Sequence, residues 1–492
     1  MLSIYKCRIF KIGAVLIFLL STGCKKFVAV EAPKTTVNEE NVYKTDETAI
    51  AVLTGIYSGM VNDGRFTGRS SISFLSGLSA DELTLAGMVT DARLIAYYKN
   101  QLRTNPNENY GTELWGGAGA NIFSYLFICN AAIEGINNSG SLTAAVKKQL
   151  LGEAKFMRAF FYFYLVNFFG DVPLVLTTNP AINASLSRSP SPQVYQQIVA
   201  DLKDAQQLLS DNYLNRNLQN YAGAPERVRP TTWAATALLA RTYLYLADYT
   251  NAELEAGKII SNTTRFTLPA AINEVFLKNS NEAIWQLQPV AAGRNTEDGV
   301  AFILPVSGPN ANINPVYLSP QLLNAFEEAD LRRKGGNWVD SVSVSGVKYF
   351  YPAKYKAAIT SGAVSEYLMI FRLAEQYLIR AEARALQGKI GDAQTDLNTI
   401  RTRAGLPDTK ANDKTSLLAA ILKERQVELF TELGQRWLDL KRTGNVDGVM
   451  NMVTPLKANG YLWQTYQQWY PVLYTDILMN HQLSQNTGYL AP

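Results

Sequence analysis

The 492-residue chain is poor in the two residue types that most often carry redox, nucleophilic and metal chemistry. It has three cysteines and one histidine. Cys7 and Cys24 lie near the N-terminus, and Cys129 falls in the apolar-periodic stretch 122–136, where we expect a small buried side chain. No disulfide framework is therefore expected. His481 lies in a polar tail, so catalysis by a histidine base and histidine metal sites are nearly excluded, and we expect no cofactor and no metal.

Concentrated positive charge is also missing. The net charge is +4, and residues 1–23 carry three basic residues and no acidic one, so the rest of the chain has 4 − 3, or about +1. Nucleic-acid binding depends on clustered Lys and Arg. Outside the first 23 residues, basic residues stand in runs of no more than three, the Lys25-Lys26 pair among them, so the sequence predicts no nucleic-acid partner.

The N-terminal apolar run is too short to span a membrane. Residues 12–20 are almost without polar groups, but a helix that crosses the hydrocarbon core needs roughly 20 such residues. The run follows the basic residues Lys6, Arg8 and Lys11. This order predicts a secretory signal peptide over residues 1–23.

The residues before Cys24 resemble the lipobox of bacterial lipoproteins. Thr22 and Gly23 are the small residues of that box, whereas Ser21 stands where an aliphatic residue is common. The resemblance implies that Cys24 is acylated (palmitate) and becomes the first residue of the mature chain. An ordinary cleaved signal with an incidental cysteine is the alternative. Residues 24–40 have few apolar anchors and are expected to form a flexible tether.

Helical periodicity dominates the rest of the chain. Small residues recur where helices would touch, and the helices fall into pairs that resemble tetratricopeptide repeats scattered along the chain. The predicted pairs are 373–387 with 393–403, capped by Asp392; 233–247 with a helix through 260; and 153–169 with 194–209. Residues 417–442 are predicted to form one long helix.

Between the helices we expect strands and long loops. Short strands are predicted within 281–288 and 342–355, and the Pro-, Gly- and Asn-rich segment 289–315 is predicted to be loop. The fold class is therefore mostly α, a scaffold of tetratricopeptide-like helix pairs with long loops and a few short strands on one side. Residues 41–492 are expected to form one domain, with interleaved parts of about 41–225 and 226–492.

Several strings, taken in order, resemble the SusD/RagB family of outer-membrane lipoproteins. The likeness extends over nearly all of the predicted mature chain. Its most specific parts are GEAKFMRAFFY at 152–162, NFFGDVPL at 167–174, FRLAE at 371–375, RWLDLKR at 436–442 and QNTGY at 485–489.

The resemblance implies a nutrient-binding lipoprotein, not an enzyme. It would face outward from the outer membrane, capture oligosaccharides, or peptides in some members, and deliver them to a SusC-like TonB-dependent transporter. By position in the family, the ligand surface would draw on Asp81, Arg93, Arg294 and Asn295. Loop aromatics that could stack on sugar rings are Tyr97, Tyr98, Tyr110 and Trp338.

Two alternatives stay open. The helix pairs could form a tetratricopeptide-type adaptor for a protein or peptide, and the 42 acidic residues could supply a carboxylate-dependent hydrolase. For Arg158, Arg372, Glu375 and Arg436, we expect a buried or half-buried ion-pair network in the helical layer.

Overall fold

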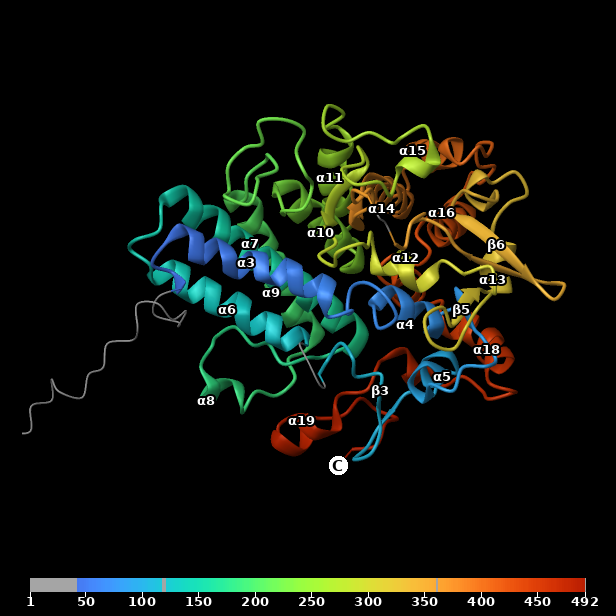
Figure 1. Ribbon diagram of the computed structural model, residues 1–492, viewed down its shortest axis with the longest axis horizontal. Coiled ribbons are helices and arrows are strands. Elements are labelled where there is room, and N and C mark those ends of the chain that lie inside the picture. Colours follow the sequence, from blue (N-terminus) through green and yellow to red (C-terminus); the bar gives the residue numbers. More distant parts are fainter. Residues whose placement is uncertain (1–41, 117–120, 360–361, 492) are drawn as a thin grey trace, which may run out of the picture.

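The computed structural model describes residues 42–116, 121–359 and 362–491 (Figure 1). The predicted signal peptide, Cys24 and the tether lie outside these residues. Within the described part, no helix is long and apolar enough to cross a membrane.

Four helices form the N-terminal half of the core: α3 (Asp46–Asn62), α6 (Ile122–Asn138), α7 (Ala144–Phe169) and α9 (Ser191–Leu208). In α7, 18 of the 26 residues are buried. A helix that is apolar on all sides is stable only when neighbours cover every face, and α6, α9 and α3 pack against it (Figure 1). Cys129 on α6 is buried, as predicted.

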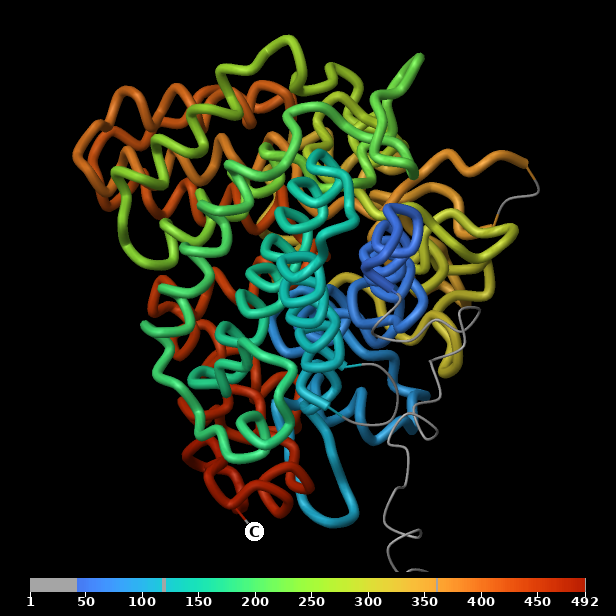
Figure 2. The backbone as a smooth tube through the Cα atoms, turned by 90° about the vertical axis from the view of Figure 1, so that its left-hand side faces the viewer, coloured from blue at the N-terminus to red at the C-terminus, as the bar shows by residue number. Residues whose placement is uncertain are grey.

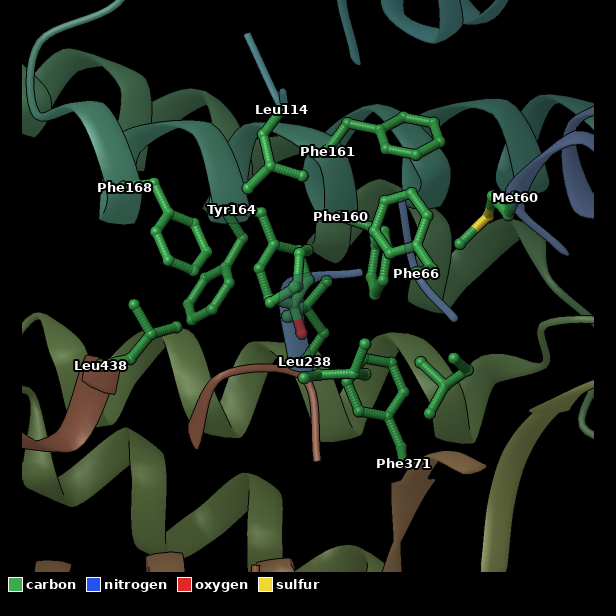
Figure 3. Close-up of a cluster of buried hydrophobic side chains, with 14 of the residues drawn as sticks. Met60, Phe66, Leu114, Phe160, Phe161, Tyr164, Phe168, Leu238, Phe371 and Leu438 are labelled. Atoms are coloured by element: carbon green, nitrogen blue, oxygen red, sulfur yellow. The ribbon is translucent and has the colours of Figure 1, made fainter. Parts of the chain in front are cut away.

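Aromatic rings fill the centre of the molecule. Phe160 of α7 lies edge-on to Tyr164 and Phe371, with ring centroids 5.0 and 6.1 Å apart. Phe66 packs on the same ring at 5.5 Å (Figure 3). These contacts join residues far apart in the sequence, so the N-terminal helices and the C-terminal strands share one core.

The predicted helix pairs are confirmed. α7 packs on α9, α10 (Thr232–Tyr245) on α11 (Tyr249–Ile260), and α14 (Leu373–Leu386) on α15 (Ile390–Arg403). The pairs are scattered in the sequence, but α9 also packs on α10 and α11 on α14, so they form one continuous array (Figure 2). Asp392 lies within the first turn of α15, because that helix begins three residues before its predicted start at 393.

The predicted long helix over 417–442 is wrong. The chain forms α16 (Lys414–Glu428) and α17 (Gln435–Arg442), separated by a turn in which Thr431, Leu433 and Gly434 have positive φ angles of 54°, 44° and 76°. A Cβ at position 434 would lie 2.9 Å from the Ser76 hydroxyl oxygen, so glycine is required. The break turns Glu432 toward buried cations. These long-range contacts stabilise the break, and helical periodicity in the sequence does not reveal them.

Within the described residues, the strands form four antiparallel pairs. β4 (Ala283–Leu287), predicted within 281–288, pairs with β8 (Leu368–Arg372). The segment 342–355 belongs to a hairpin of β6 (Val339–Val344) and β7 (Val347–Pro352). β1 (Leu83–Leu85) pairs with β5 (Val316–Leu318), and β2 (Arg103–Thr104) with β3 (Asn109–Tyr110).

Shorter helices connect these layers. The segment 289–315, predicted to be loop, contains one of them, α12 (Glu297–Phe302). The others are α4 (Ile72–Ser79), α5 (Ala92–Tyr98), α8 (Pro180–Asn183), α13 (Pro320–Ala325), α18 (Val446–Lys457), α19 (Tyr474–Met479) and the 3₁₀ turns η2 (Ile272–Glu274), η3 (Leu331–Arg333) and η4 (Thr465–Gln468). A mostly helical fold is confirmed; the domain boundaries stay a prediction.

A buried ion-pair network holds the strands to the helical array. The Arg372 guanidinium contacts Glu282 at 2.8 Å, Glu428 at 2.5 Å and Glu432 at 2.7 Å. Lys354 contacts Glu432 at 2.5 Å, and its burial lowers its pKa to about 8.

The predicted ion pairs of the other three residues are also present. Arg158 contacts Asp201 at 2.7 Å, Glu375 contacts Arg241 at 2.6 Å, and Arg436 contacts Asp81 at 2.7 Å. The charge pattern in these helices therefore serves the scaffold.

Another buried carboxylate, that of Asp298, holds the loop before α4 in place. The Asp298 Oδ1 atom accepts hydrogen bonds from the Thr67 hydroxyl (2.9 Å) and the Gly68 amide (2.7 Å). Burial raises the Asp298 pKa to about 7, and the neighbouring charge of Glu297 acts in the same direction. Asp298 thereby ties residues 67–68 to α12.

We predict that Arg372→Met strongly destabilises the fold. The change leaves Glu282, Glu428 and Glu432 without a shared buried cation, at a cost of about 3–5 kcal/mol in the free energy of unfolding measured with urea. Arg103→Met is the control, because Arg103 is an exposed arginine paired with Glu108 at the surface, so its loss should leave the free energy of unfolding close to that of wild type. Equal stability of the two variants would contradict the structural role of Arg372.

We predict that Asp298→Asn flattens the pH dependence of stability. Because the folded-state pKa of Asp298 is raised above its ordinary value of 3.8 to about 7, its contribution is fully present below about pH 4 and is lost as the pH rises through 7. Between pH 5 and 8, wild type should lose up to about 3 kcal/mol more unfolding free energy than the variant. The exposed control Asp211→Asn should follow wild type; an Asp298→Asn variant that also follows it disproves the prediction.

Candidate functional site

Three half-buried tyrosines form the surface that we call the aromatic row: Tyr98, Tyr317 and Tyr349. Tyr317 lies at the middle of β5, opposite Thr84 of β1. Its neighbours Val316 and Leu318 are buried, and since side chains alternate along a strand, Tyr317 faces outward.

The other two rings both lie near Tyr317. The Tyr349 ring of β7 is 5.1 Å away, edge-on at 79°. The β6–β7 hairpin turns at Ser345 and Gly346, whose φ angles of 50° and 82° suit a two-residue turn. Tyr98 ends α5; burial raises its pKa, and the nearby Tyr317 hydroxyl raises it further. Two strands and a helix, β5, β7 and α5, therefore carry the three rings, and α5 and β5 lie near each other in Figure 1.

Four polar residues beside β1 and β5 form the polar cluster: Arg69, Asp91, Arg93 and Asn312. Asp91 caps α5 with one carboxylate oxygen, and the other lies 3.8 Å from Arg69 and 3.7 Å from Arg93. Arg69 also donates to the Asn312 carbonyl, which joins the loop before α4 to the loop before β5. All four side chains retain solvent-exposed area.

Arg294 lies at the edge of this cluster. Its guanidinium contacts Glu297 at 2.7 Å, and its side chain is 43% exposed. A Cβ at Gly68 would lie 3.3 Å from the Glu297 Cβ atom, so the loops that carry Arg69 and Arg294 touch. The structure therefore brings three predicted residues, Arg93, Tyr98 and Arg294, to one region of the surface.

The row and the cluster combine two kinds of recognition. Ring faces offer flat apolar surface, and the arginines and Asp91 offer hydrogen-bond donors and acceptors. That combination suits a ligand with both apolar faces and hydroxyl groups. Among the described residues, no group of three or more His, Cys, Asp or Glu is placed to hold a metal ion.

Four predicted ligand residues are instead buried. Tyr97 donates to Glu113 and packs on Tyr470. The Asn295 side chain accepts hydrogen bonds from the Ser365 and Glu366 amides at 2.8 and 3.1 Å. These two side chains hold segments of the chain together, and neither presents a surface to a ligand in this structure.

Trp338 and Asp81 belong to the buried charge networks. Trp338 is fully buried, its indole nitrogen donates to the Ile272 carbonyl at 2.9 Å, and the Lys354 and Arg372 cations lie over its ring. The neighbouring glycines gave it the sequence pattern of a loop. Burial acts to raise the Asp81 pKa, but the Arg436 guanidinium outweighs it and holds the pKa below its usual value.

Tyr110 lies on the β2–β3 hairpin, which is not part of the row. The Arg103 guanidinium covers its ring at 5.3 Å. Sequence reasoning did not find Arg69, Asn312, Tyr317 or Tyr349. The apolar–Tyr–apolar pattern at 316–318 was the available signal for Tyr317, but its outward face depends on pairing with distant β1.

Family models match two parts of the chain. The model described as "SusD family" matches residues 338–489, and the model described as "Starch-binding associating with outer membrane" matches residues 68–244.

Individual proteins give the same result. "SusD-like protein P2" of Formosa agariphila is 25% identical over 480 residues, which is 88% of this chain and 90% of that protein. "Starch-binding protein SusD" of Bacteroides thetaiotaomicron is 36% identical over 132 residues, 24% of this chain and 21% of that protein. A solved "Laminarin binding SusD-like protein" superimposes with a TM-score of 0.71 at 23% identity, covering 91% of this chain and all of that one. The two family models together with the near full-length relative establish that the chain belongs to the SusD/RagB family.

Proposed function

We propose that this protein captures oligosaccharides at the cell surface and passes them to a SusC-like TonB-dependent transporter in the outer membrane. SusD-family proteins bind their ligands and do not catalyse reactions on them. The observation that carries the proposal is the aromatic row beside the polar cluster, in a chain whose relatives include a laminarin-binding and a starch-binding protein.

The row suits a sugar chain because of its chemistry and shape. The apolar C–H faces of a pyranose stack on tyrosine rings, and its hydroxyls need both donors and acceptors at the edge. The polar cluster supplies both: two guanidinium groups and the Asp91 carboxylate. A neutral oligosaccharide stacked on Tyr317 would lie on the strand that follows Asn312, whose carbonyl accepts a hydrogen bond from Arg69.

The tetratricopeptide-type adaptor is less well supported. Such an adaptor needs an open face of its helix pairs for a partner. In this chain α10 is buried along most of its length and packs on β4 and β8, and α14 also contacts β8. The chain thus covers this part of the helical array with its own strands.

The anchor and the transporter complete the proposal. A lipid on Cys24 would hold the chain at the outer membrane, and residues 24–40 would give the folded part freedom to move over the barrel. The outer-membrane association named for the matching family model supports this location.

We predict that Tyr317→Ala and Tyr349→Ala each weaken oligosaccharide binding by about tenfold, or ~1.4 kcal/mol, because each removes a stacking surface. Isothermal titration calorimetry with laminarihexaose and maltohexaose would measure the change. Tyr110→Ala, on the separate β2–β3 hairpin, is the control and should bind as wild type does. If wild type binds tightly and both row variants keep the same affinity, the ligand does not bind at the row.

We predict that the wild-type chain fractionates with outer membranes and co-purifies with a large barrel protein in mild detergent. Cys24→Ala should release the chain from the membrane fraction without changing its thermal unfolding or its oligosaccharide affinity. Membrane fractionation of the variant at the wild-type level refutes acylation. If no barrel protein co-purifies with the wild-type chain in repeated preparations, the proposed partnership with a transporter is contradicted.

A further inference from the structure

A cavity, here called the loop pocket, lies on a different part of the molecule from the aromatic row. It opens between α3, the segment 214–229 and the end of β4, and has a volume of about 170 Å³. Figure 1 shows the α9–α10 connection as a green loop above α3 and α10, whereas α5, β5 and β6 lie on the other side of the molecule. The aromatic row and the loop pocket share no residue.

The floor of the loop pocket is rigid and electrically neutral. The Arg229 guanidinium contacts the buried Glu153 at 2.5 Å and the Thr54 hydroxyl at 2.7 Å. It also lies over the Tyr57 ring, 5.8 Å from the centroid. Burial acts to lower the Arg229 pKa, but the charge of Glu153 outweighs it and raises the pKa, so Arg229 stays charged and neutralised by its partner.

The walls carry a second, more open pair of opposite charges. The Glu226 carboxylate is held by the Tyr367 hydroxyl, which donates to its Oε1 atom at 2.9 Å. The second oxygen of Glu226 and the exposed Arg216 make no hydrogen bond or ion pair with any residue that the structure describes. A ligand would therefore meet one acceptor and one donor of balanced charge.

The remaining wall is a flat apolar surface with one aromatic ring. Tyr221 is half-buried, and its pKa is raised by burial and by Glu226, which places the ring beside that carboxylate. Leu214 and Leu287 add apolar area, and Val290 is 44% exposed at the mouth.

The segment that carries these side chains is itself folded. Leu214 forms a β-bridge with Asn220, and the Asn215 amide donates to the Gln219 carbonyl at 2.8 Å. Leu218 adopts a positive φ of 57° at the turn. The pocket is therefore formed before any ligand arrives, which reduces the entropy lost on binding.

We propose that the loop pocket is a second binding site, for a single uncharged sugar residue at the end or branch of a glycan. Tyr221 would stack on the ring, while Glu226 and Arg216 would bond its hydroxyls. The balanced charges favour a neutral ligand over an acidic one. The volume is below the roughly 300–1,000 Å³ of sites for larger ligands, which limits the site to about one residue. This proposal rests on the proposed function, because it assumes a glycan ligand.

The test counts binding sites with laminarihexaose and maltohexaose as probes, by equilibrium dialysis over a concentration range that reaches saturation. Wild type should bind two equivalents of at least one probe. Tyr221→Ala and Glu226→Gln should each remove one equivalent, or weaken it at least tenfold, and leave the other unchanged. Tyr349→Ala should affect only the equivalent that those variants leave intact. Thermal unfolding of each variant checks that its fold is unchanged.

Three other outcomes are distinguishable. If wild type binds only one equivalent, and that equivalent is lost in Tyr349→Ala but kept in Tyr221→Ala, the loop pocket is not a binding site. The proposed function then still stands. Two equivalents, both insensitive to Tyr221→Ala and Glu226→Gln, place the second site elsewhere and also overturn it. No binding of either probe by wild type counts against both proposals.

Discussion

The Arg372 guanidinium is the interaction on which the arrangement of this molecule depends. It stands at the end of β8, where the chain enters α14. It contacts Glu282 before β4, Glu428 at the end of α16 and Glu432 just after that helix. Three segments distant in sequence therefore meet at one buried cation. A buried charge is tolerated only when its partners are in place, so these contacts select a single way of docking the strands on the helices.

The same principle acts at smaller scale around the binding surfaces. Arg436 neutralises Asp81 directly before β1, and β1 in turn holds β5 and Tyr317. Asp298 fixes the loop that carries Arg69, using amide and hydroxyl donors in place of a cation. Arg229 and Glu153 form the floor of the loop pocket. In each case a satisfied buried charge lies beneath an exposed side chain that can contact a ligand.

The sequence strings that carry the family resemblance contain mostly residues of this buried scaffold. Arg158, Arg372, Glu375 and Arg436 all fall within or beside the strings that carry the resemblance, and all four are paired in the interior. The aromatic row draws on Tyr317 and Tyr349, which lie outside those strings. Relatives at about 25% identity can therefore share the core and differ in the surface that meets the ligand.

The sequence by itself determined the helix pairs, because helical periodicity is a local property of the chain. Its ordered strings were enough to indicate the family, and they also contain the charged residues expected to pair in the interior. Helical periodicity did not determine that α16 and α17 separate, since the turn at Thr431–Gly434 is favoured by the contacts of Glu432 with Arg372 and Lys354 as well as by the positive φ that Gly434 allows. Nor did it separate buried from exposed candidates: Tyr97 and Tyr98 are neighbours, yet one faces Tyr470 and the other Tyr317. Only the tertiary structure decided which aromatic rings face outward, because exposure depends on strands and loops that pair across hundreds of residues.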